Sequence, residues 1–573
     1  MRIEGHAGQQ TVAALQAFGS DVMFTLNGGH IWPLYEAARD RGMRIVDTRH
    51  EQTATFAAEG WAKLTRRPGV AALTAGPGVT NGISAVTSAH FNGSPLVVLG
   101  GRAPQGRWGA GSLQEFDHVP VLAPITKLAA TVTDPATAGR QVHDAARLAT
   151  ESHRGPVFLD FPLDVFGPSA GDVPTSGAAG GIAPDPEAVA RLGQAVAAAE
   201  RPAFLVGSDA YWDGAWQELA AAASALGVPC FFNGLGRGLL PADHELAFLR
   251  TRGLLKERAD LVVVIGTPLD FRVGFGRFGE ARVMHVVDSP SQAAGHVDAP
   301  TVAGDIAATL RGLAEHRGDR VDHSDWIAEL RAAERAAIAD EAPLLAAGDD
   351  PIKPTRIYGE LRKRLARDAV VVCDGGDFVS YAGKYVEVHQ PGGWLDTGPY
   401  GCLGNGLGYA IAARVARPDA QVVVMMGDGA AGFSLMDVDT LVRHGLPVVI
   451  VVGNNGIWGL EKHPMQFIYG WDVACDLQPG TRYDKVVEAL GDLDDAGDAG
   501  GVVDGAAVDL AVVVLAQVVP VAHVHHRLVG ALGAGQHADH VARGLLGDRA
   551  LQVERYRRVQ RHRLEAALAG RRV

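Results

Sequence analysis

Residues Gln421–Leu460 read QVVVMMGDGAAGFSLMDVDTLVRHGLPVVIVVGNNGIWGL, and this stretch decides the fold. The uninterrupted apolar run over 422–426 predicts a strand buried on both faces, as parallel strands are. The run stops at Gly427-Asp428-Gly429, where such a strand would end. Because ligands of open α/β folds collect at the carboxyl ends of parallel strands, the pattern places a carboxylate at a ligand-binding edge.

The rest of the stretch repeats this arrangement. The roughly helical apolar spacing over 432–444 predicts a helix, and the apolar run over 446–452 predicts a second buried strand. That strand ends before Gly453-Asn454-Asn455. Two adjacent parallel strands would therefore deliver Asp428 and Asn455 side by side.

Two oxygen ligands beside flexible glycines suit Mg²⁺, which prefers hard oxygen donors and completes its octahedron with phosphate and water. The helix expected just after Gly429 would direct its free N–H groups at the same phosphate. Turn preferences alone could also explain a lone Gly-Asp-Gly, because strand ends often carry such residues. The spacing between Asp428 and Asn455 is the more specific signal.

The Gly-Asp-Gly motif followed 27 residues later by the second Asn resembles the thiamine diphosphate signature of the acetolactate synthase, pyruvate oxidase and decarboxylase superfamily. The resemblance implies that Asp428, Asn455 and the main-chain carbonyl of Ile457 hold a Mg²⁺ ion that bridges the diphosphate of the coenzyme. It also implies that Gly427, Gly429 and Ala430 line the coenzyme site.

Length and composition bound the remaining interpretation. A chain of 573 residues predicts about three domains. The net charge of −13 argues against nucleic acid or an anionic membrane as the main partner. Four widely separated cysteines predict ordinary thiols of a reducing compartment, and there is neither a leader pattern nor an apolar run long enough to span a membrane. We expect a cytoplasmic protein.

The predicted fold class is α/β, with three domains that each contain a doubly wound parallel sheet. They are a pyrimidine-binding domain, a central domain and a diphosphate-binding domain. The expected order is a pyrimidine-binding domain over 1–168, a Gly-, Ser- and Pro-rich linker over 169–185, a central domain over 186–340, a diphosphate and Mg²⁺ domain over 351–490, and an atypical tail over 491–573.

In the first domain, Glu51 lies where a strand expected over 43–47 gives way to a small-residue helix that runs to Leu64. A carboxylate at a helix start is favoured by the helix dipole, which is an alternative explanation for Glu51. The surrounding run over 49–101 closely resembles the pyrimidine-binding domain of the acetolactate synthase family. The resemblance makes Glu51 the catalytic acid that contacts N1′ of the aminopyrimidine.

The same resemblance supplies further site residues. It places the loop from Gly76, including Pro77 and Asn81, beside the coenzyme ring. The segment Gly111–Asp117 resembles a family segment whose Gln approaches the reacting carbon, so Gln114 is either an active-site residue or a satisfied polar loop residue. Gly29, where a strand expected over 22–26 breaks, is expected to face the substrate.

Thiamine diphosphate supplies the carbanion chemistry, so the protein must supply binding, orientation and proton control. A carboxyl group desolvated by apolar neighbours can stay protonated near neutral pH and donate to N1′. The implied reaction decarboxylates a 2-keto acid such as pyruvate and joins the remaining fragment to a second 2-keto acid. This is the transferase chemistry of acetolactate synthases in branched-chain amino acid biosynthesis.

The central domain carries Gly266–Gly276, which follows a strand and could cradle a nucleotide, although glycine-rich strand ends are common. Strands are expected over 203–207, 261–266 and 282–288. By resemblance this domain binds FAD in a non-redox role in acetolactate synthases. Arg272 falls on a family arginine that holds the acceptor carboxylate, for which a planar guanidinium is suited.

The third domain adds two more candidate segments. A strand over 370–373 ends in Asp374-Gly375-Gly376-Asp377, and Gly376 and Asp377 are candidates to cap the diphosphate. Leu403 falls on a family methionine that wedges the coenzyme into its bent shape, and a core leucine is the alternative.

Three positions depart from the family pattern. Leu163 stands where acetolactate synthases carry a lysine. Leu460 stands where they carry a methionine, and Pro464 stands where they carry the tryptophan that grips the second keto acid. The acceptor pocket is therefore not the standard one. Oxalyl-CoA decarboxylases and 2-hydroxyacyl-CoA lyases share the core, so a decarboxylase or lyase remains an alternative, as does an inactive homologue that keeps the fold.

The tail from Gly491 to Val573 contains no Ser, Thr, Asn, Lys, Ile, Phe, Met, Trp or Cys. Selected domains need β-branched and aromatic residues for their cores and Ser, Thr or Asn for caps and turns. Because every residue there apart from Tyr556 has codons that begin with G or C, we hypothesise that a GC-rich gene has been read out of frame from about Gly491. Loss of the native closing strand and helix would expose an edge of the third sheet.

An intact-mass measurement on protein from the source organism, matched to a resequenced gene, tests the reading frame. We expect a mass that disagrees with this tail. A mass that agrees with it in active enzyme would overturn the hypothesis.

By resemblance the expected partners are a small 2-keto acid and further copies of the same chain. In the family the first domain of one subunit faces the third domain of another, so a homodimer or tetramer with active sites between subunits is expected. The resemblance is to large, catalytic subunits, which leaves a regulatory subunit open as a partner.

Overall fold

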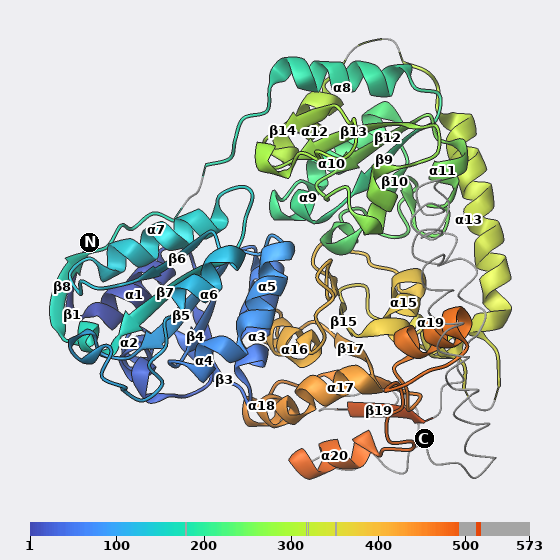
Figure 1. Cartoon of the computed structure of the whole chain (residues 1–573). Coiled ribbons are helices and arrows are strands. Elements are labelled where there is room, and N and C mark those ends of the chain that lie inside the picture. Colours follow the sequence, from blue (N-terminus) through green and yellow to red (C-terminus); the bar gives the residue numbers. More distant parts are fainter. Residues whose placement is uncertain (178–179, 317, 319, 350–351, 492–510, 517–573) are drawn as a thin grey trace, which may run out of the picture.

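Three parallel β-sheets, one in each domain, make up the fold (Figure 1). The computed structural model describes residues 1–177, 180–316, 318, 320–349, 352–491 and 511–516. The first domain (blue and cyan) lies beside the third (orange), and the central domain (green) lies above them in Figure 1. This arrangement confirms the predicted α/β fold of three domains.

The sheet of the first domain has the strand order β3-β2-β4-β5-β7-β6. Its strands are β2 (Val22–Thr25), β3 (Arg44–Asp47), β4 (Gly69–Leu73), β5 (Leu96–Arg102), β6 (Leu128–Thr131) and β7 (Val157–Pro162). Its helices are α1 (Ala7–Gln16), α2 (Trp32–Asp40), α3 (Glu51–Thr65), α4 (Pro77–Asn81), α5 (Ile83–Phe91), α6 (Val119–Leu122) and α7 (Ala138–Thr150). The predicted strand-to-helix junction at Glu51 is therefore present, and Glu51 is the first residue of α3.

A small antiparallel sheet, which the sequence did not reveal, closes this domain. Strand β1 (Arg2–His6) pairs with β8 (Pro168–Asp172), so the segment expected to be a linker over 169–185 begins as a strand. The correction has a simple cause. Pairing with β1 satisfies backbone groups of this glycine- and serine-rich segment, which carries no hydrophobic period of its own.

The central sheet has the strand order β11-β10-β9-β12-β13-β14. Its strands are β9 (Pro202–Val206), β10 (Cys230–Phe232), β11 (Ala247–Phe248), β12 (Leu261–Ile265), β13 (Arg282–Val287) and β14 (Thr301–Ala303). Its helices are α8 (Pro186–Ala198), α9 (Ser208–Trp212), α10 (Trp216–Leu226), α11 (Leu254–Arg258), α12 (Ile306–Ala314) and the long α13 (Ser324–Leu345). The three strands predicted from apolar runs, β9, β12 and β13, are neighbours in this sheet.

The third sheet has the strand order β16-β15-β17-β18-β19. Its strands are β15 (Val370–Asp374), β16 (Trp394–Leu395), β17 (Val422–Gly427), β18 (Val449–Asn454) and β19 (Ala511–Ala516). Its helices are α14 (Pro354–Leu361), α15 (Gly376–Tyr385), α16 (Asn405–Ala416), α17 (Asp428–Ser434), α18 (Val438–Arg443), α19 (Gly459–Tyr469) and α20 (Tyr483–Leu490). Because β19 pairs with β18, one strand of the atypical tail covers this edge of the sheet. The tail outside 511–516 and Gly491 lies beyond the described residues, and the reading-frame hypothesis stays a prediction.

The single helix predicted over 432–444 is broken into α17, a short 3-10 turn over Leu435–Asp437, and α18. Two polar side chains, one in the break and one after it, contact the first domain. Asp437 accepts a hydrogen bond of 2.7 Å from the backbone N–H of Arg49, and Arg443 pairs with Asp47 at 2.9 Å. Contacts with the first domain therefore accompany a conformation that the local apolar spacing does not predict.

Helices α3 and α16 lie side by side and join the first domain to the third (Figure 1). Two glycines allow their close approach. A Cβ on Gly60 would lie 2.9 Å from the ring of Tyr409, and a Cβ on Gly408 would lie 2.6 Å from the Cβ of Phe56. Beneath this crossing, Lys63 donates to the Tyr409 hydroxyl at 2.7 Å, and the hydroxyl donates to Glu59 at 2.8 Å. The buried Lys63–Glu59 ion pair of α3 is thus joined to the third domain through the hydroxyl of Tyr409.

Among the described residues, no helix combines the length and the apolar character that a membrane crossing requires.

Candidate functional site

The two predicted metal ligands of the third domain come together at the carboxyl edge of its sheet. Strands β17 and β18 are direct neighbours, with Gly427 opposite Gly453. The buried Asp428 accepts a hydrogen bond of 2.7 Å from the backbone N–H of Gly456, so its carboxylate reaches the loop that carries Asn455. Burial raises the pKa of Asp428, and the backbone N–H groups around the carboxylate partly offset this effect.

The donor set at this edge fits Mg²⁺. It combines the carboxylate of Asp428, the amide oxygen of Asn455 and the main-chain carbonyl of Ile457, all of them hard oxygens. The side-chain oxygen of Asn455 accepts a hydrogen bond of 3.1 Å from the backbone N–H of Ile457, which holds the amide in the same tight turn. These three residues would hold the ion, and the ion would neutralise the charge of a bound diphosphate.

A cavity of about 350 Å³ opens beside Asp428 and Gly429. It is lined by Asp428, Gly429, Gly432, Phe433, Trp458, Leu477, Gln478, Thr481 and Tyr483. A Cβ on Gly429 would lie 2.5 Å from the indole of Trp458, so only glycine fits there. Sequence reasoning missed Phe433, Trp458 and Tyr483; Trp458 stands three residues after Asn455, and this short distance is the signal that could have found it.

The segment from Asp374 to Asp377 lies against the same edge. Gly375 has a left-handed backbone with φ +95°, and a Cβ on it would meet Ala430 at 2.8 Å and Leu403 at 3.9 Å. A Cβ on Gly376 would meet the side chain of Leu460 at 2.7 Å. The predicted coenzyme residues Leu403, Ala430 and Gly376 are therefore gathered at one edge of the sheet.

Asp377, the other candidate to cap the diphosphate, lies at the start of α15. A Cβ on Gly459 would lie 3.3 Å from its carboxylate and 3.7 Å from the amide nitrogen of Asn455. Asp377 is thus close to a predicted metal ligand.

Asp374 fixes the segment that carries Leu403. Its buried carboxylate accepts from the backbone N–H of Gly404 at 3.1 Å and from that of Gly406 at 2.9 Å. Burial raises the pKa of Asp374 to about 7, although these two N–H groups favour the charged form. Asp374 is a positioning residue that acts through the backbone of its neighbours.

The raised pKa of Asp374 predicts a pH-dependent stability. Because the folded protein holds this proton more tightly than the unfolded chain, the stabilisation is present below the ordinary value of 3.8 and is lost as the pH rises through about 7. We expect the free energy of unfolding of the wild type, minus that of Asp374→Asn, to fall by up to about 1.4 kcal/mol per pH unit across that window. Urea titrations at several pH values measure it.

The same substitution at the exposed Asp419 is the control and should show no such trend. A difference between wild type and Asp374→Asn that stays constant from pH 4 to pH 8 would contradict the assignment.

In the first domain, Glu51 is buried at the start of α3. One carboxylate oxygen accepts a hydrogen bond of 3.0 Å from the side-chain amide of Asn81, so two predicted coenzyme residues are in direct contact. The other oxygen lies 3.7 Å from where a Cβ on Gly78 would stand. Next to Glu51, the side-chain amide of Gln52 donates a hydrogen bond of 3.1 Å to the carbonyl of Leu403. This bond links the site to the third domain within one chain.

Gln114 lies against the loop that begins at Gly76. A Cβ on Gly76 would be 3.0 Å from that of Gln114, which itself has the unusual φ of +58°. The loop is held by a residue that sequence reasoning missed. Nε2 of His118 accepts a hydrogen bond of 3.0 Å from the backbone N–H of Gly76, and its Nδ1 lies 3.1 Å from the carboxylate of Asp160.

Pro77 follows Gly76 as the first residue of α4. Gly29 opens a 3-10 turn, and the next residue, His30, was also missed. Its Nδ1 lies 3.3 Å from the hydroxyl of Thr74, and burial lowers its pKa. Because His30 also contacts the backbone of Leu113, Gly29 lies at the same edge of the sheet as Gln114.

Arg272 lies apart from these residues, in the central domain. Its guanidinium makes bonds of 2.7 and 3.0 Å to the carboxylate of Asp270, so its planar fork is engaged within its own loop. It lines a second cavity of about 490 Å³, whose walls come from all three domains. The cavity is lined by His90, Phe91, Asn92, Lys127, Ser152, His153, Arg154, Gly155, Ser208, Asp209, Gly266, Thr267, Pro268, Arg272, Ser291, Gln292 and Pro399.

Comparison with known protein families gives three matches along the chain. The N-terminal TPP binding domain of thiamine pyrophosphate enzymes matches residues 5–121. The central domain of these enzymes matches residues 189–313, and their C-terminal TPP binding domain matches residues 374–495. The three matches follow the order of the three sheets.

Two groups of relatives resemble the chain over most of its length. The acetolactate synthase large subunit IlvG of Mycobacterium tuberculosis is 49% identical over 494 residues, which covers 85% of this chain and 90% of the relative. The 2-hydroxyacyl-CoA lyase 2 of Homo sapiens is 34% identical over 534 residues, with 85% of this chain and 84% of the relative covered. The same lyase of Bos taurus is 35% identical over 541 residues, covering 85% of this chain and 84% of the relative.

Proposed function

The chain belongs to the thiamine diphosphate-dependent, acetolactate synthase-like enzymes, and from this premise we propose that it decarboxylates pyruvate and joins the two-carbon fragment to a second 2-keto acid. The observation that carries the proposal is the pairing of Asp428 with the Asn455 loop at the edge of the third sheet. The 49% identity to an acetolactate synthase favours this activity over that of the more distant lyases.

When bound, thiamine diphosphate supplies the carbanion stabilisation that the reaction needs. The protein's own residues have separate tasks. Asp428, Asn455 and Ile457 would hold Mg²⁺, which would neutralise charge on the diphosphate, and the N–H groups at the start of α17 would favour the same anion. Glu51, oriented by Asn81, holds a proton for N1′ of the pyrimidine, and Gln114 orients the substrate.

A direct assay tests the function. Purified enzyme with thiamine diphosphate and Mg²⁺ should release carbon dioxide from pyruvate and form a carboligation product. The second candidate is a 2-hydroxyacyl-CoA lyase, favoured by the replacement of the methionine and the acceptor-gripping tryptophan by Leu460 and Pro464. Cleavage of 2-hydroxyacyl-CoA or oxalyl-CoA without product from pyruvate would favour that candidate and reject the first.

We expect Asp428→Asn to weaken Mg²⁺ binding by roughly 100-fold or more, because the ion loses its only anionic protein ligand among the three proposed. Calorimetric titration of Mg²⁺ in the presence of thiamine diphosphate measures the change. The exposed Asp419→Asn is the matched control and should bind as the wild type does. Equal affinities in Asp428→Asn and the wild type would show that the ion binds elsewhere.

For FAD, the cavity lined by Arg272 and bordered by all three domains is the proposed site. Its volume of about 490 Å³ is within the range of small-molecule sites. Its wall carries the cations Lys127, Arg154 and Arg272, of which Arg154 and Arg272 already pair with Asp213 and Asp270. Gly266 and Thr267 line it at the carboxyl end of β12, where ligands of such sheets bind. Flavin absorbance of the supernatant after heat denaturation of the purified protein tests the proposal.

We propose that the active enzyme is a homodimer or a homotetramer, with each active site completed by a second copy. The cavity around Asp428 is lined by the third domain alone, whereas Glu51 contacts Asn81 of the first domain. Large apolar side chains near the cavity are exposed, among them Phe433 and Met436. A regulatory subunit and a cytoplasmic location stay predictions.

A further inference from the structure

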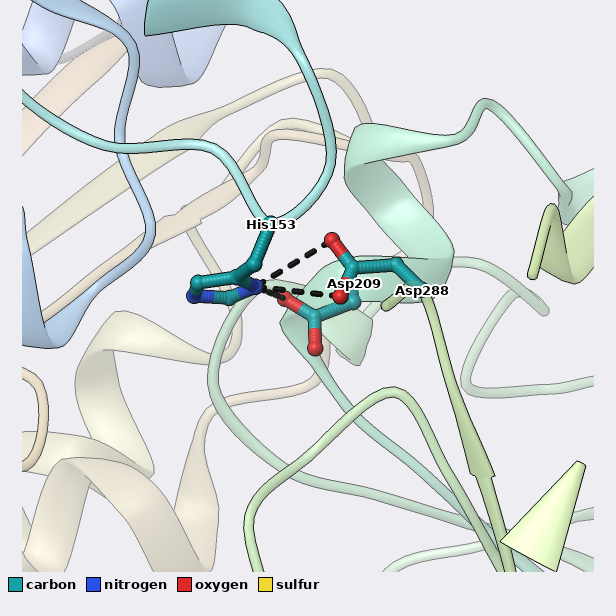
Figure 2. Close-up of side chains that lie close together, drawn as sticks. All are labelled: His153, Asp209 and Asp288. Carbon is teal, nitrogen blue, oxygen red and sulfur yellow. Dashed lines mark hydrogen bonds and ion pairs between the residues drawn. The ribbon is translucent and has the colours of Figure 1, made fainter. Parts of the chain in front are cut away.

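Three side chains from two domains meet at the rim of the central cavity. His153 comes from the loop after α7 in the first domain, Asp209 from α9, and Asp288 from the end of β13 in the central domain. Figure 2 shows the imidazole facing both carboxylates. None of the three belongs to the proposed thiamine diphosphate site, whereas His153 and Asp209 line the cavity proposed above for FAD.

The spacing of these atoms suits one metal ion. Nδ1 of His153 lies 3.1 Å from both oxygens of Asp288 and 3.8 Å from Oδ1 of Asp209, and one ligand atom from each residue falls within 4.8 Å of the others. An ion with bonds of about 2.1 Å separates its neighbouring ligand atoms by about 3.0–3.4 Å. The three groups therefore need only small shifts to enclose an ion.

The carboxylates around the cluster outnumber the fixed positive charges, which favours a cation. Asp209 and Asp288 are buried, and a third carboxylate, Asp213, takes the guanidinium of Arg154 at 2.9 Å. Arg154 lies 3.9 Å from Asp288. Burial, with a contribution from the charge of Asp288, raises the pKa of Asp209 to about 7.

The remaining charged neighbours lie further out. The ammonium of Lys127 donates to the main-chain carbonyls of Glu151 at 2.7 Å and His153 at 2.8 Å. Burial, together with the charge of His153, lowers the pKa of His90, which lines the same cavity. Arg154 is thus the fixed positive charge nearest to three carboxylates, and Lys127 is engaged with carbonyls.

The cavity of about 490 Å³, lined by both His153 and Asp209, gives an ion an entry path and gives water a place to complete the coordination. We propose that His153, Asp209 and Asp288 form a binding site for a divalent transition-metal ion of the zinc and manganese class, which clamps the first domain to the central domain. One imidazole nitrogen with two carboxylates suits these ions, whereas Mg²⁺ prefers oxygen alone.

A Co²⁺ titration tests the site. The full-length enzyme is stripped with a chelator and then saturated with Mg²⁺ and thiamine diphosphate, which blocks the site at Asp428. We expect one further equivalent of Co²⁺ to bind per chain with ligand-field absorption bands, and Zn²⁺ to displace it. Both ions should raise the unfolding temperature, because they bind the folded state.

The variants His153→Gln and Asp288→Asn should each weaken Co²⁺ binding by roughly 100-fold or more, since loss of a direct ligand exceeds the effect of a residue that only orients one. His90→Gln is the matched control, because His90 lines the same cavity outside the cluster, and it should bind as the wild type does.

Two results would overturn the proposal. One is unchanged Co²⁺ affinity in His153→Gln, which decides the question if Asp288→Asn does not fold. The other is a wild-type protein that binds no second ion. Its unfolding temperature would then depend on pH, and His153→Gln would abolish that dependence. The cluster would then be an ion pair of a protonated histidine with two carboxylates.

Discussion

Glu51→Gln is expected to lower kcat with pyruvate by roughly 10²- to 10⁴-fold, the usual contribution of a positioned acid or base. Glutamine has the same shape, and its carbonyl oxygen can still accept the 3.0 Å hydrogen bond from Asn81. What the variant loses is the proton that the carboxyl group would share with N1′. Binding of the coenzyme and the unfolding temperature should therefore change little.

Two measurements separate the chemical effect from a structural one. Steady-state kinetics give kcat, and exchange of the thiazolium C2 proton with deuterated water, followed by NMR, reports the proton step alone. Both should slow in Glu51→Gln. The control is Glu36→Gln, the same change at an exposed position of the first domain. A Glu51→Gln enzyme within threefold of wild type in both measurements would remove Glu51 from the mechanism.

Lys63→Met is expected to destabilise the protein by about 3–5 kcal/mol, because it leaves the buried carboxylate of Glu59 without its cation. The side chain of Lys63 is 3% exposed and that of Glu59 is 0% exposed, and the two are 3.0 Å apart. Glu59 would keep hydrogen bonds from Asn92 at 2.8 Å and from Tyr409, but neither neutralises its charge. Urea unfolding of the apoenzyme measures the change.

A double-mutant cycle shows whether the charge is responsible. Glu59→Gln keeps an acceptor for Tyr409, so Lys63→Met/Glu59→Gln should be less destabilised than the sum of the single variants. Lys363→Met, at a side chain that is 67% exposed, is the control and should cost no more than about 1 kcal/mol. Additive effects in the cycle, or a loss below about 1 kcal/mol in Lys63→Met, would contradict the assigned role.

Much of the fold could be predicted from the sequence where burial alone decides the structure. The apolar runs over 422–426 and 446–452 become β17 and β18, because strands buried on both faces need a continuous apolar sequence. Since neighbouring parallel strands end at one edge, the proximity of Asp428 to the Asn455 loop could be predicted as well.

The features that sequence reasoning missed depend on contacts between distant residues. Strand β1 opens the first domain and β8 follows all of its other strands and helices, so Arg2 pairs with the distant Asp172. Neither strand has an apolar period, so only their pairing makes them strands. His118 holds Gly76 from 42 residues away through a single hydrogen bond, which no local pattern encodes. Tyr483 reaches the cavity beside Asp428 from the start of α20, after an irregular segment.

Arg272 illustrates a different limit. The resemblance assigned it to the acceptor carboxylate from its position in the chain alone, but position says nothing of the partners a side chain finds. In the structure its guanidinium is engaged by Asp270, two residues earlier. A role in substrate binding would require that this pair separate, and it stays a prediction.

The crossing of α3 and α16 has a consequence for protein engineering. Gly60 and Gly408 bring the helices into backbone-to-side-chain contact, and Lys63 and Glu59 are charged groups without access to water. If the amino-terminal portion were expressed as a separate fragment, these groups and the apolar surface around them would be hydrated, and the fragment would tend to aggregate. Split or chimeric versions of this enzyme should therefore exchange both helices together.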